Sequence, residues 1–383
     1  MSLKEALEQR RKEGLYRTRK VIQTAQSTEV EVGGRKVINF CSNDYLGLAN
    51  HPDVIAAFQQ GAARYGVGSG SAHLVCGHSE AHHTLEEALA KFTGRDRVLL
   101  FSTGYMANMG AISALIGRSG EVFEDRLNHA SLLDGGWLST AKFSRYRHAD
   151  MASLESLLKK STADEKLLVS DGVFSMDGDI APLPEMVALC EQYGVQLLID
   201  DAHGFGVLGE QGGGCASYYS LSQKEIPVLV GTLGKAFGTF GAFVAGSEEL
   251  IEYLIQKSRS YIYTTALPPA VAEATLTSLK ILQEEDWRRE RLKKLIGRFR
   301  IGAERLGIKL MTSETPIQPI LIGESDKATV VSERLLKRGI WISAIRPPTV
   351  PKGSARLRVT LSAEHSDDQL DRLLDALAGA MYG

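Results

Sequence analysis

The sequence has few cysteines, almost no net charge and no long uninterrupted apolar run. Its four cysteines, Cys41, Cys76, Cys190 and Cys215, are scattered over 383 residues without a C-x-x-C pair. This scatter argues against a structural zinc and a disulfide framework, and it favours reduced thiols in the cytoplasm. The 44 lysines and arginines nearly balance the 46 aspartates and glutamates. Composition therefore indicates neither a nucleic-acid partner nor an anionic membrane.

No segment has the pattern of an export signal or a membrane span. The first residues, MSLKEALEQRRKEG, interleave charges with leucines and lack the apolar stretch of a signal peptide. Residues 228–246 approach the length of a span, but they contain Lys235 and five glycines. A lysine in the middle of a bilayer costs about 2.5–3.5 kcal/mol. We therefore expect buried strands and turns here, in a cytoplasmic protein with no membrane partner.

Strand-like apolar runs alternate with helical patterns in the middle of the chain. The helical patterns include MASLESLLKK and LPEMVALCEQYG. The apolar runs lie at 97–102, 121–125, 166–173, 195–203, 228–235 and 241–246. This alternation predicts an α/β fold with a mostly parallel sheet and helices on both of its faces.

The C-terminal part shows a different pattern. A helical stretch at 276–307, which we expect to be exposed, precedes a mixed set of elements. These are strand-like segments at 317–323, 340–345 and 355–363 and helical patterns at 327–339 and 368–381. They predict a compact α+β unit. We place an N-terminal arm at 1–44, a large domain at 45–284 and a small domain at 285–383.

The segment LLIDDAHGFG ends an apolar strand with Asp200, Asp201 and His203. Ligands of open α/β sheets bind at the carboxyl ends of the strands. A shielded carboxylate there can hold a ring nitrogen protonated, and His203 can reach another polar atom of the same ligand, as a pyridinium cofactor requires. An aspartate that only caps a turn explains this segment alone equally well.

The segment VGTLGKAFGTFGAF places Lys235 among glycines and apolar residues. Glycine lets the backbone approach a ligand closely, and an amine removed from water favours the neutral form that Schiff-base chemistry needs. Most lysines are solvated surface residues, but Leu233, Phe237 and Phe240 leave this one no obvious polar face. A buried lysine after Asp-x-x-His indicates pyridoxal 5'-phosphate.

A phosphate site is indicated where a strand runs into a helix at Gly104 and Tyr105. The N–H groups and dipole of a helix N-terminus favour an anion, although ordinary strand-to-helix turns look similar. Thr232 could add a hydroxyl contact. His129, at the start of another helical pattern, could stack on a cofactor ring or could be an ordinary polar residue at a helix start.

Three competing motifs are not supported. YGVGSGSAH has Ser71 where a dinucleotide-binding fingerprint has its last glycine, and no G-x-x-x-x-G-K-[ST] phosphate loop occurs. HSEAHH at 78–83 precedes TLEEALAKF and is typical of the polar start of an amphipathic helix. We therefore expect no metal site there.

Together, eight segments resemble the α-oxoamine synthases, pyridoxal-phosphate enzymes that condense an amino acid with an acyl-CoA thioester. They are NFCSNDYLGLANHP, GSGSAHLVCGH, LNHASLLDG, SDGVFSMDGD, LLIDDAHGFG, TLGKAFG, YIYTTALPP and IRPPTVPKGSARLRVTLSA. The resemblance covers almost the whole chain. It implies fold type I, the aminotransferase-like fold with a seven-stranded sheet, and a homodimer with shared active sites.

The resemblance also implies a role for each matching residue. Lys235 would form the Schiff base and accept the Cα proton, Asp200 would face the pyridine nitrogen, and His203 would donate to the phenolic oxygen. His129 would stack on the ring and contact the substrate carboxylate. The other cofactor contacts would be Gly104, Tyr105, Ser175, Thr232 and, across the dimer interface, Thr264 or Thr265.

On the substrate side, Arg358 resembles the clamp on the amino-acid carboxylate, which suits a bidentate guanidinium. Arg17, Arg346 and Thr349 would line the acyl side. The stretch AIRPPTVP resembles the members that join L-alanine to a pimeloyl thioester, carried by CoA or a carrier protein, in biotin synthesis.

Two alternatives stay open. One is a sister synthase that uses glycine with acetyl-CoA or succinyl-CoA, and the other is a binding subunit without cofactor, against which Lys235, Asp200 and His203 argue. Phe205 and Asp171 depart from commoner family residues. We expect these two departures to affect the fit of the acyl chain rather than the chemistry.

Overall fold

The computed structural model describes residues 2–13 and 15–381. The chain divides into two compact units. Unit 1 comprises Met1–Asn50, Met176–Gly178 and Trp287–Gly383, and unit 2 comprises His51–Ser175 and Asp179–Asp286. The division at 1–44, 45–284 and 285–383 expected from the sequence stays a prediction.

Unit 2 is built on a seven-stranded sheet with the order β3-β9-β8-β7-β6-β4-β5. Strands β8, β7, β6, β4 and β5 run parallel, whereas β9 is antiparallel to both of its neighbours. The bounds are β3 Arg97–Phe101, β4 Glu121–Asp125, β5 Lys142–Tyr146, β6 Lys166–Asp171, β7 Gln196–Asp200, β8 Val228–Thr232 and β9 Ala242–Gly246. The predicted α/β fold with a mostly parallel sheet is confirmed.

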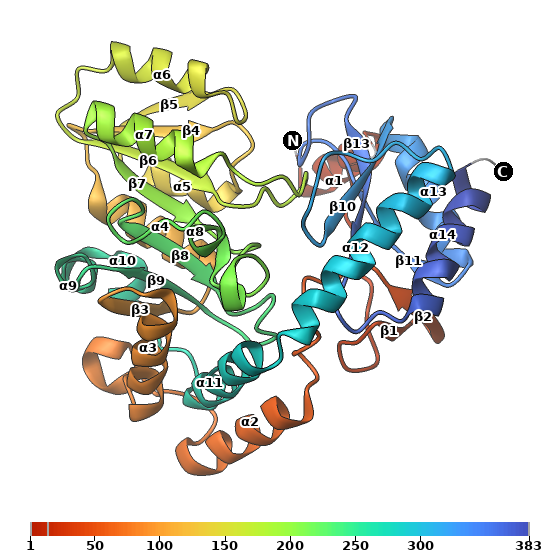
Figure 1. Cartoon of the computed structure of the whole chain (residues 1–383), viewed down its shortest axis with the longest axis horizontal. Coiled ribbons are helices and arrows are strands. Elements are labelled where there is room, and N and C mark those ends of the chain that lie inside the picture. The colour runs from red at the N-terminus through yellow and green to blue at the C-terminus, as the bar shows by residue number, and fades with distance from the viewer. Residues whose placement is uncertain (1, 14, 382–383) are drawn as a thin grey trace. The chain divides into compact units, whose positions relative to one another are not determined.

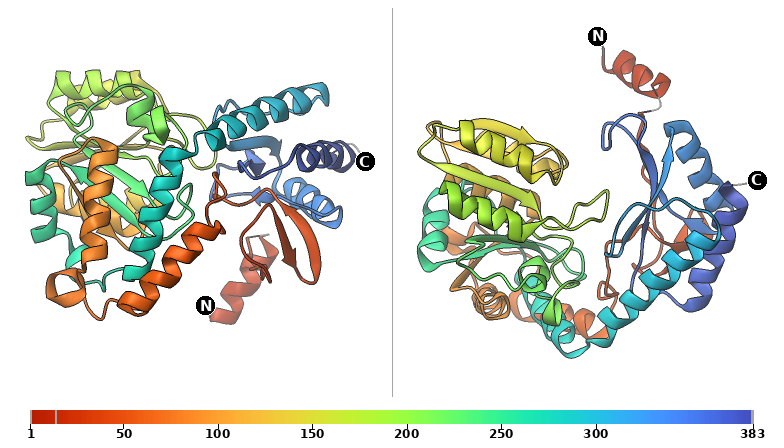
Figure 2. Two further views of the ribbon diagram at one scale, coloured as in Figure 1. Left: turned by 60° about the horizontal axis from the view of Figure 1, so that its bottom comes forward. Right: turned by 45° about the horizontal axis from the view of Figure 1, so that its top comes forward.

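Helices cover both faces of this sheet (Figure 1). On one face, α4 (Gly104–Leu115), α5 (Ala130–Leu138) and α9 (Glu248–Lys257) share a buried core with alternate strand residues. On the other face, α6 (Met151–Lys160) and α7 (Leu183–Tyr193) lie side by side (Figure 2). Because successive strand residues point to opposite faces, apolar residues at consecutive strand positions serve both cores. Leu167 and Val169 face the α4 side, for example, while Leu168 between them is also buried.

Unit 2 contains further helical segments. They are α2 (Pro52–Tyr65), η1 (His73–Gly77), α3 (Glu80–Thr93), η2 (Glu210–Gly212), α8 (Gly214–Tyr218), α10 (Arg259–Ile262) and α11 (Pro269–Glu284). Helices α2 and α11 pack together, with Gly61 against the backbone of Ala270. A Cβ at Gly61 would lie 2.9 Å from the Ala270 Cα, so glycine permits this close packing.

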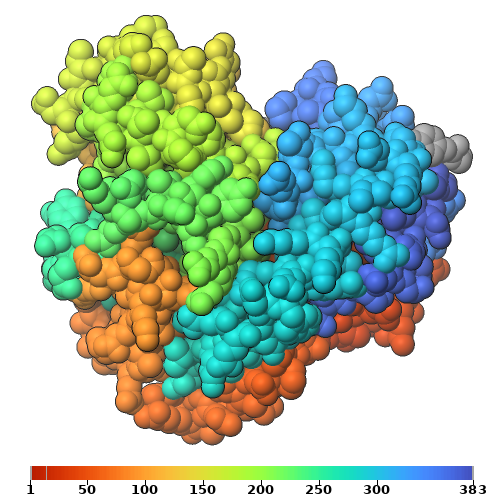
Figure 3. All heavy atoms as spheres, viewed as in Figure 1, coloured from red at the N-terminus to blue at the C-terminus, as the bar shows by residue number. Residues whose placement is uncertain are grey.

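The described residues of unit 1 form two three-stranded sheets and four helices. One sheet has the order β1-β2-β11 and the other β10-β13-β12. The strands are β1 Glu29–Val32, β2 Arg35–Asn39, β10 Ile317–Gly323, β11 Ile340–Trp341, β12 Ser343–Ile345 and β13 Ala355–Thr360, and the helices are α1 Leu3–Lys12, α12 Trp287–Arg305, α13 Ser325–Lys337 and α14 Asp367–Met381. Strand β2 pairs with β11, so segments from the two ends of the sequence lie side by side, as the red and blue atoms of Figure 3 also show.

The helical stretch at 276–307 differs from the prediction. It is divided between α11 and α12, and neither helix is simply exposed. Helix α11 buries Leu279 and Leu282, and α12 buries Leu292 and Phe299. The expectation was wrong because the many charges of this stretch conceal one apolar face on each helix.

Residues 228–246 form β8, a turn and β9, as expected. Within the described part of the chain, no helix is long and apolar enough to cross a membrane. All four cysteines are free thiols.

Candidate active site

A pocket in unit 2 lies where β6, β7 and β8 reach their carboxyl ends. Its lining residues are Gly104, Tyr105, His129, Ser131, Asp171, Ser175, Asp200, Ala202, His203, Thr232 and Lys235. The structure therefore brings together all the cofactor candidates of the sequence analysis except Thr264 and Thr265. Ligands of open α/β sheets bind at this edge.

Asp200 is the last residue of β7 and is 5% exposed. Its Oδ1 accepts a hydrogen bond from the Ala202 amide at 3.0 Å, and its Oδ2 accepts one from the Asn108 side chain at 2.5 Å. The neighbouring Asp201 instead accepts from the Cys215 amide at 2.6 Å. Burial raises the pKa of Asp201 to about 7. Of the two adjacent aspartates, Asp200 lines the pocket and Asp201 supports the start of α8.

The N-terminus of α4 supplies a second wall of the pocket. The Thr103 hydroxyl caps this helix by accepting from the Met106 amide at 3.2 Å. The N–H groups of Gly104 and Tyr105 precede the first intrahelical hydrogen bond. A Cβ placed on Gly104 would meet no atom within 4 Å, so the space beside this backbone is open. An anion can approach here.

His129 is the N-cap residue of α5 and lies beside Asp171, Tyr105 and Ser131. Its backbone amide donates to Asp171 Oδ2 at 2.6 Å, and its ring meets the Tyr105 ring edge-on at 6.3 Å between centroids. The Tyr105 hydroxyl donates to the Asp134 carboxylate. Desolvation by the pocket walls lowers the pKa of His129, with Asp200 opposing this effect and Lys235 adding to it. Burial, reinforced by the charge of Asp200, raises the pKa of Asp171 well above its usual range.

Lys235 lies in the turn between β8 and β9. The Leu233 amide donates to the Gly241 carbonyl at 2.9 Å, and the Thr232 hydroxyl donates to the same carbonyl at 3.1 Å, which closes the turn. Leu233 and Phe237 are buried as expected, but Phe240 is 49% exposed and Lys235 is only half-buried. The sequence pattern overstated the burial because it could not show that Lys235 faces a pocket.

The substrate-side candidates belong to unit 1. Arg358 is buried in β13, and both of its terminal nitrogens donate to Asn43 Oδ1 at 3.2 Å. Arg356, two residues earlier, is ion-paired with Asp177. Arg17 and Thr349 are exposed and Arg346 is half-buried.

Thr264 and Thr265 lie outside the pocket. They follow α10, and Thr265 forms an isolated β-bridge with Ala72. Thr265 is exposed.

Phe205, one of the two departures from the commoner family residues, packs in the interior of unit 2. Its ring stacks on Phe237 at 5.3 Å between centroids and meets Phe243 and Phe92 edge-on. It is 1% exposed and therefore belongs to the core. The effect of both departures on the fit of the acyl chain stays a prediction, and Asp171 lines the pocket directly.

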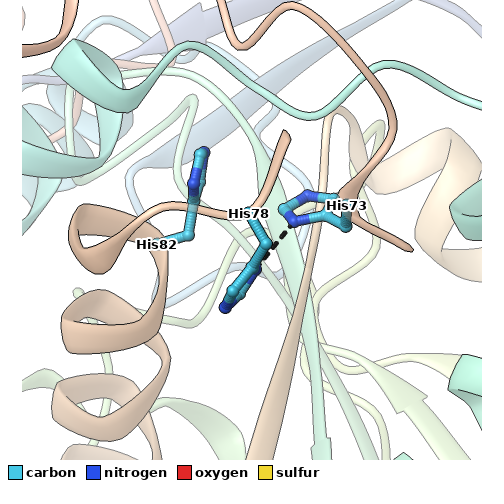
Figure 4. A group of neighbouring side chains, drawn as sticks. All are labelled: His73, His78 and His82. Carbon is cyan, nitrogen blue, oxygen red and sulfur yellow. Dashed lines mark hydrogen bonds between the residues drawn. The ribbon is translucent and has the colours of Figure 1, made fainter. Parts of the chain in front are cut away.

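Figure 4 shows His73, His78 and His82. His73 Nδ1 lies 2.9 Å from His78 Nδ1. The Ser79 amide donates to His82 Nδ1 at 3.0 Å, and His82 Nε2 lies 2.7 Å from the Leu267 carbonyl, so both ring nitrogens of His82 are engaged. Helix α3 begins at Glu80 with Ser79 as its cap, which confirms the predicted helix start.

The sequence analysis missed two polar residues of the site, Asn108 and Ser131. Asn108 is fully buried in α4, four residues after Gly104 and thus on the same face of the helix. Ser131 lies two residues after His129 and is also fully buried. An asparagine within the largely apolar helix GYMANMGAISAL was the signal available in the sequence.

Comparisons with known proteins agree with this geometry. Residues 35–377 match the class I and II aminotransferase family. The 8-amino-7-oxononanoate synthase of Nitrosococcus oceani is 61% identical over 371 residues, covering 97% of this chain and 98% of that protein. The protein of the same name from Thioalkalivibrio sulfidiphilus is 60% identical over 382 residues, covering 100% and 97%.

Among solved structures, serine palmitoyltransferase from S. paucimobilis with a bound PLP–myriocin aldimine is similar. Its TM-score is 0.94 at 32% identity, covering 99% of this chain and 96% of that one. The fold is therefore that of the class I and II aminotransferases, and the type I expectation is confirmed. Within that class, the chain belongs to the 8-amino-7-oxononanoate synthase family. The resemblance to the α-oxoamine synthases is thereby confirmed as well.

Proposed function

We propose that this chain catalyses the decarboxylative condensation of L-alanine with a pimeloyl thioester. The products are 8-amino-7-oxononanoate, CO2 and the free thiol of CoA or of a carrier protein, and the reaction belongs to biotin biosynthesis. The observation that carries the proposal is the single pocket that gathers Lys235, Asp200, His203 and the N-terminus of α4. The cofactor is pyridoxal 5'-phosphate.

The pocket residues fit this cofactor by their chemistry. Asp200 offers a buried carboxylate to the ring nitrogen, Lys235 offers an amine to the aldehyde, and the open N–H groups of Gly104 and Tyr105 offer donors to the phosphate. Thr232, Ser175 and His203 supply further polar contacts, and His129 supplies an aromatic face. When bound, the cofactor provides an electron sink for the charge that develops at Cα.

The protein side chains bind and move protons around that sink. The Lys235 amine takes the Cα proton of alanine and later returns a proton to the product. Asp200 would stabilise positive charge at the cofactor ring nitrogen, His203 would donate to its phenolic oxygen, and Ser175 would lie beside the ring. Arg358 binds the carboxylate of alanine through a charge-assisted fork. Arg17, Arg346 and Thr349 bind the acyl side.

The active form is a homodimer in this proposal. Thr264 and Thr265 do not line the pocket of their own chain, and Thr265 is exposed. They are therefore available to reach the cofactor phosphate of a partner. The protein is cytoplasmic, with small-molecule substrates and neither nucleic-acid nor membrane partners. A monomeric active species in analytical ultracentrifugation would contradict the shared site.

Carboxyl-labelled alanine tests the reaction most sharply. Condensation with loss of the alanine carboxyl group sends all of a label at C1 into CO2, whereas a label at C3 stays in the product. We expect a mass spectrum of 8-amino-7-oxononanoate that carries the C3 label and lacks the C1 label. Retention of the C1 label, or no condensation product at all, would refute the proposal. The Lys280→Ala variant is the control and should give the same labelling pattern, because this exposed lysine lies on α11 outside the pocket.

A further inference from the structure

A chain of buried polar groups connects two walls of the pocket. Asn108 Nδ2 donates to Asp200 Oδ2 at 2.5 Å and to Ser131 Oγ at 2.8 Å. Ser131 Oγ in turn lies 2.8 Å from His129 Nδ1. Asn108 and Ser131 are both fully buried. The partner of the cofactor ring nitrogen is thus linked to the histidine that faces the ring.

The directions of these hydrogen bonds follow from the acceptors. The amide nitrogen of asparagine carries two hydrogens, which suit the Asp200 carboxylate and the Ser131 hydroxyl oxygen. Reversing the Asn108 amide would place its oxygen against the carboxylate. Ser131 Oγ therefore accepts from Asn108, and its own hydrogen is available to His129 Nδ1.

A second donor reaches the same nitrogen of His129. The Ser131 backbone amide donates to His129 Nδ1 at 3.3 Å, the capping contact of α5. With two donors on Nδ1, the neutral imidazole carries its proton on Nε2. The lowered pKa of His129 agrees with a neutral ring.

The free-energy cost of burying Asn108 indicates that this residue has a role beyond packing. Asn108 Oδ1 is buried and has no hydrogen-bond partner among the described residues. An unpartnered buried oxygen destabilises the fold, and an apolar residue at this position would avoid this cost. Asn108 therefore destabilises α4 while it orients two groups of the site.

We propose that Asn108 and Ser131 are positioning residues that hold Asp200 in place and lock His129 in its Nε2–H tautomer. His129 then presents a hydrogen-bond donor, not a base, to an oxygen of the bound substrate. Only the hydrogen bond from His129 to the substrate rests on the proposed function. Lys235 remains the group that moves the Cα proton.

The tautomer can be read in the unmodified protein. Nitrogen NMR of protein labelled with ¹⁵N-histidine separates protonated from unprotonated ring nitrogens, and the His129→Gln variant assigns one of the nine histidines. With pyridoxal phosphate bound and at neutral pH, we expect a protonated Nε2 and an unprotonated Nδ1. A protonated Nδ1 would overturn the proposal. This readout needs no substrate, so it is independent of whether the condensation reaction occurs.

A double-mutant cycle tests the connection itself. Asn108→Leu and Ser131→Ala each remove one link, and we expect each to weaken cofactor binding about tenfold and to shift the pH dependence of the visible absorbance of the bound cofactor. Because both act on one chain of contacts, the double variant is expected to bind no more weakly than the weaker single variant. If the two single-variant losses of cofactor affinity multiply in the double variant, the proposal is overturned.

The matched control is Ser113→Ala, in the same helix. The Ser113 hydroxyl donates to the Met109 carbonyl, and Ser113 does not line the pocket. It should leave cofactor binding and the absorbance unchanged. If Asn108→Leu does not fold, Asn108→Ala completes the cycle with the same two outcomes. The two proposals can fail separately. If the protein catalyses no condensation, but His129 is protonated on Nε2 and the two substitutions are not additive, the proposed function is refuted and the positioning role of Asn108 and Ser131 is not.

Discussion

The pocket residues of unit 2 and the substrate-side residues of unit 1 are held in different ways. In unit 2, Asp200, Thr232 and Gly104 lie at the ends of strands or at the start of a helix, where sheet registers and capping fix their backbone. In unit 1, Arg17 and Thr349 are exposed outside regular elements, and only Arg358 sits in a buried strand. Side chains on helices and strands keep fixed positions, whereas loops are more mobile and tolerate more substitutions. In the proposed function, cofactor chemistry would therefore depend on the scaffold, and acyl preference would depend on loops.

Lys235→Ala, in the unit 2 pocket, is expected to lower activity most severely. Without the amine, no group of the pocket takes the Cα proton, and we expect thiol release to fall at least about a thousandfold. Pyridoxal phosphate should still bind, but without a covalent bond. Thiol release and intact-protein mass after borohydride treatment measure the two effects. Activity within tenfold of the parent would remove Lys235 from its assigned role.

Arg358→Lys probes the one substrate-side residue that the scaffold holds. Lysine keeps the charge but loses the planar fork, so kcat/KM for alanine should fall about ten- to a hundredfold. The KM for the pimeloyl thioester should stay the same. Steady-state kinetics with each substrate varied in turn checks this. Arg372→Ala, exposed on α14 in the same unit, is the control and should change neither constant.

The His148 ring meets edge-on the ring of Phe174, the residue before Ser175 in unit 2. Burial alone would lower its pKa, but hydrogen bonds to Asp125 and Asp179 raise it to about 9, above the ordinary 6.5. Its stabilisation is therefore complete below about pH 6.5 and is lost as the pH rises through 9. We expect His148→Gln to lower the free energy of unfolding by about 1–3 kcal/mol at neutral pH.

Chemical denaturation between pH 6 and pH 10 provides the measurement. The difference between the parent and His148→Gln should shrink toward the alkaline end. The exposed His83→Gln on α3 is the control and should show no such trend. A difference that grows with pH would show that His148 is neutral in the folded protein.

The smallest effects are expected from the exposed loop residues of unit 1. Arg17→Ala and Thr349→Ala each remove a solvated contact, so the KM for the pimeloyl thioester should rise about two- to fivefold. The KM for alanine and the kcat should not change. If either variant abolishes turnover, the contrast between scaffold and loop is wrong for that position.

The same contrast explains what the sequence could predict. Asp200, His203 and Lys235 follow apolar strands, and that pattern is local, so their common location was predictable. Strand β5, KFSRY, was not identified because it is an edge strand with exposed polar residues. The contacts of Asn108 with Asp200 and Ser131 join residues 92 and 23 positions away, and no local pattern reports such pairs.

One measurement tests the central claim most directly. Thiol release by the cofactor-loaded protein is compared for L-alanine, glycine, L-serine and L-threonine, each with pimeloyl-, acetyl- and succinyl-CoA. The account predicts release only with L-alanine and pimeloyl-CoA. Preference for glycine with acetyl- or succinyl-CoA would contradict it and would move the chain to a sister activity on the same pocket.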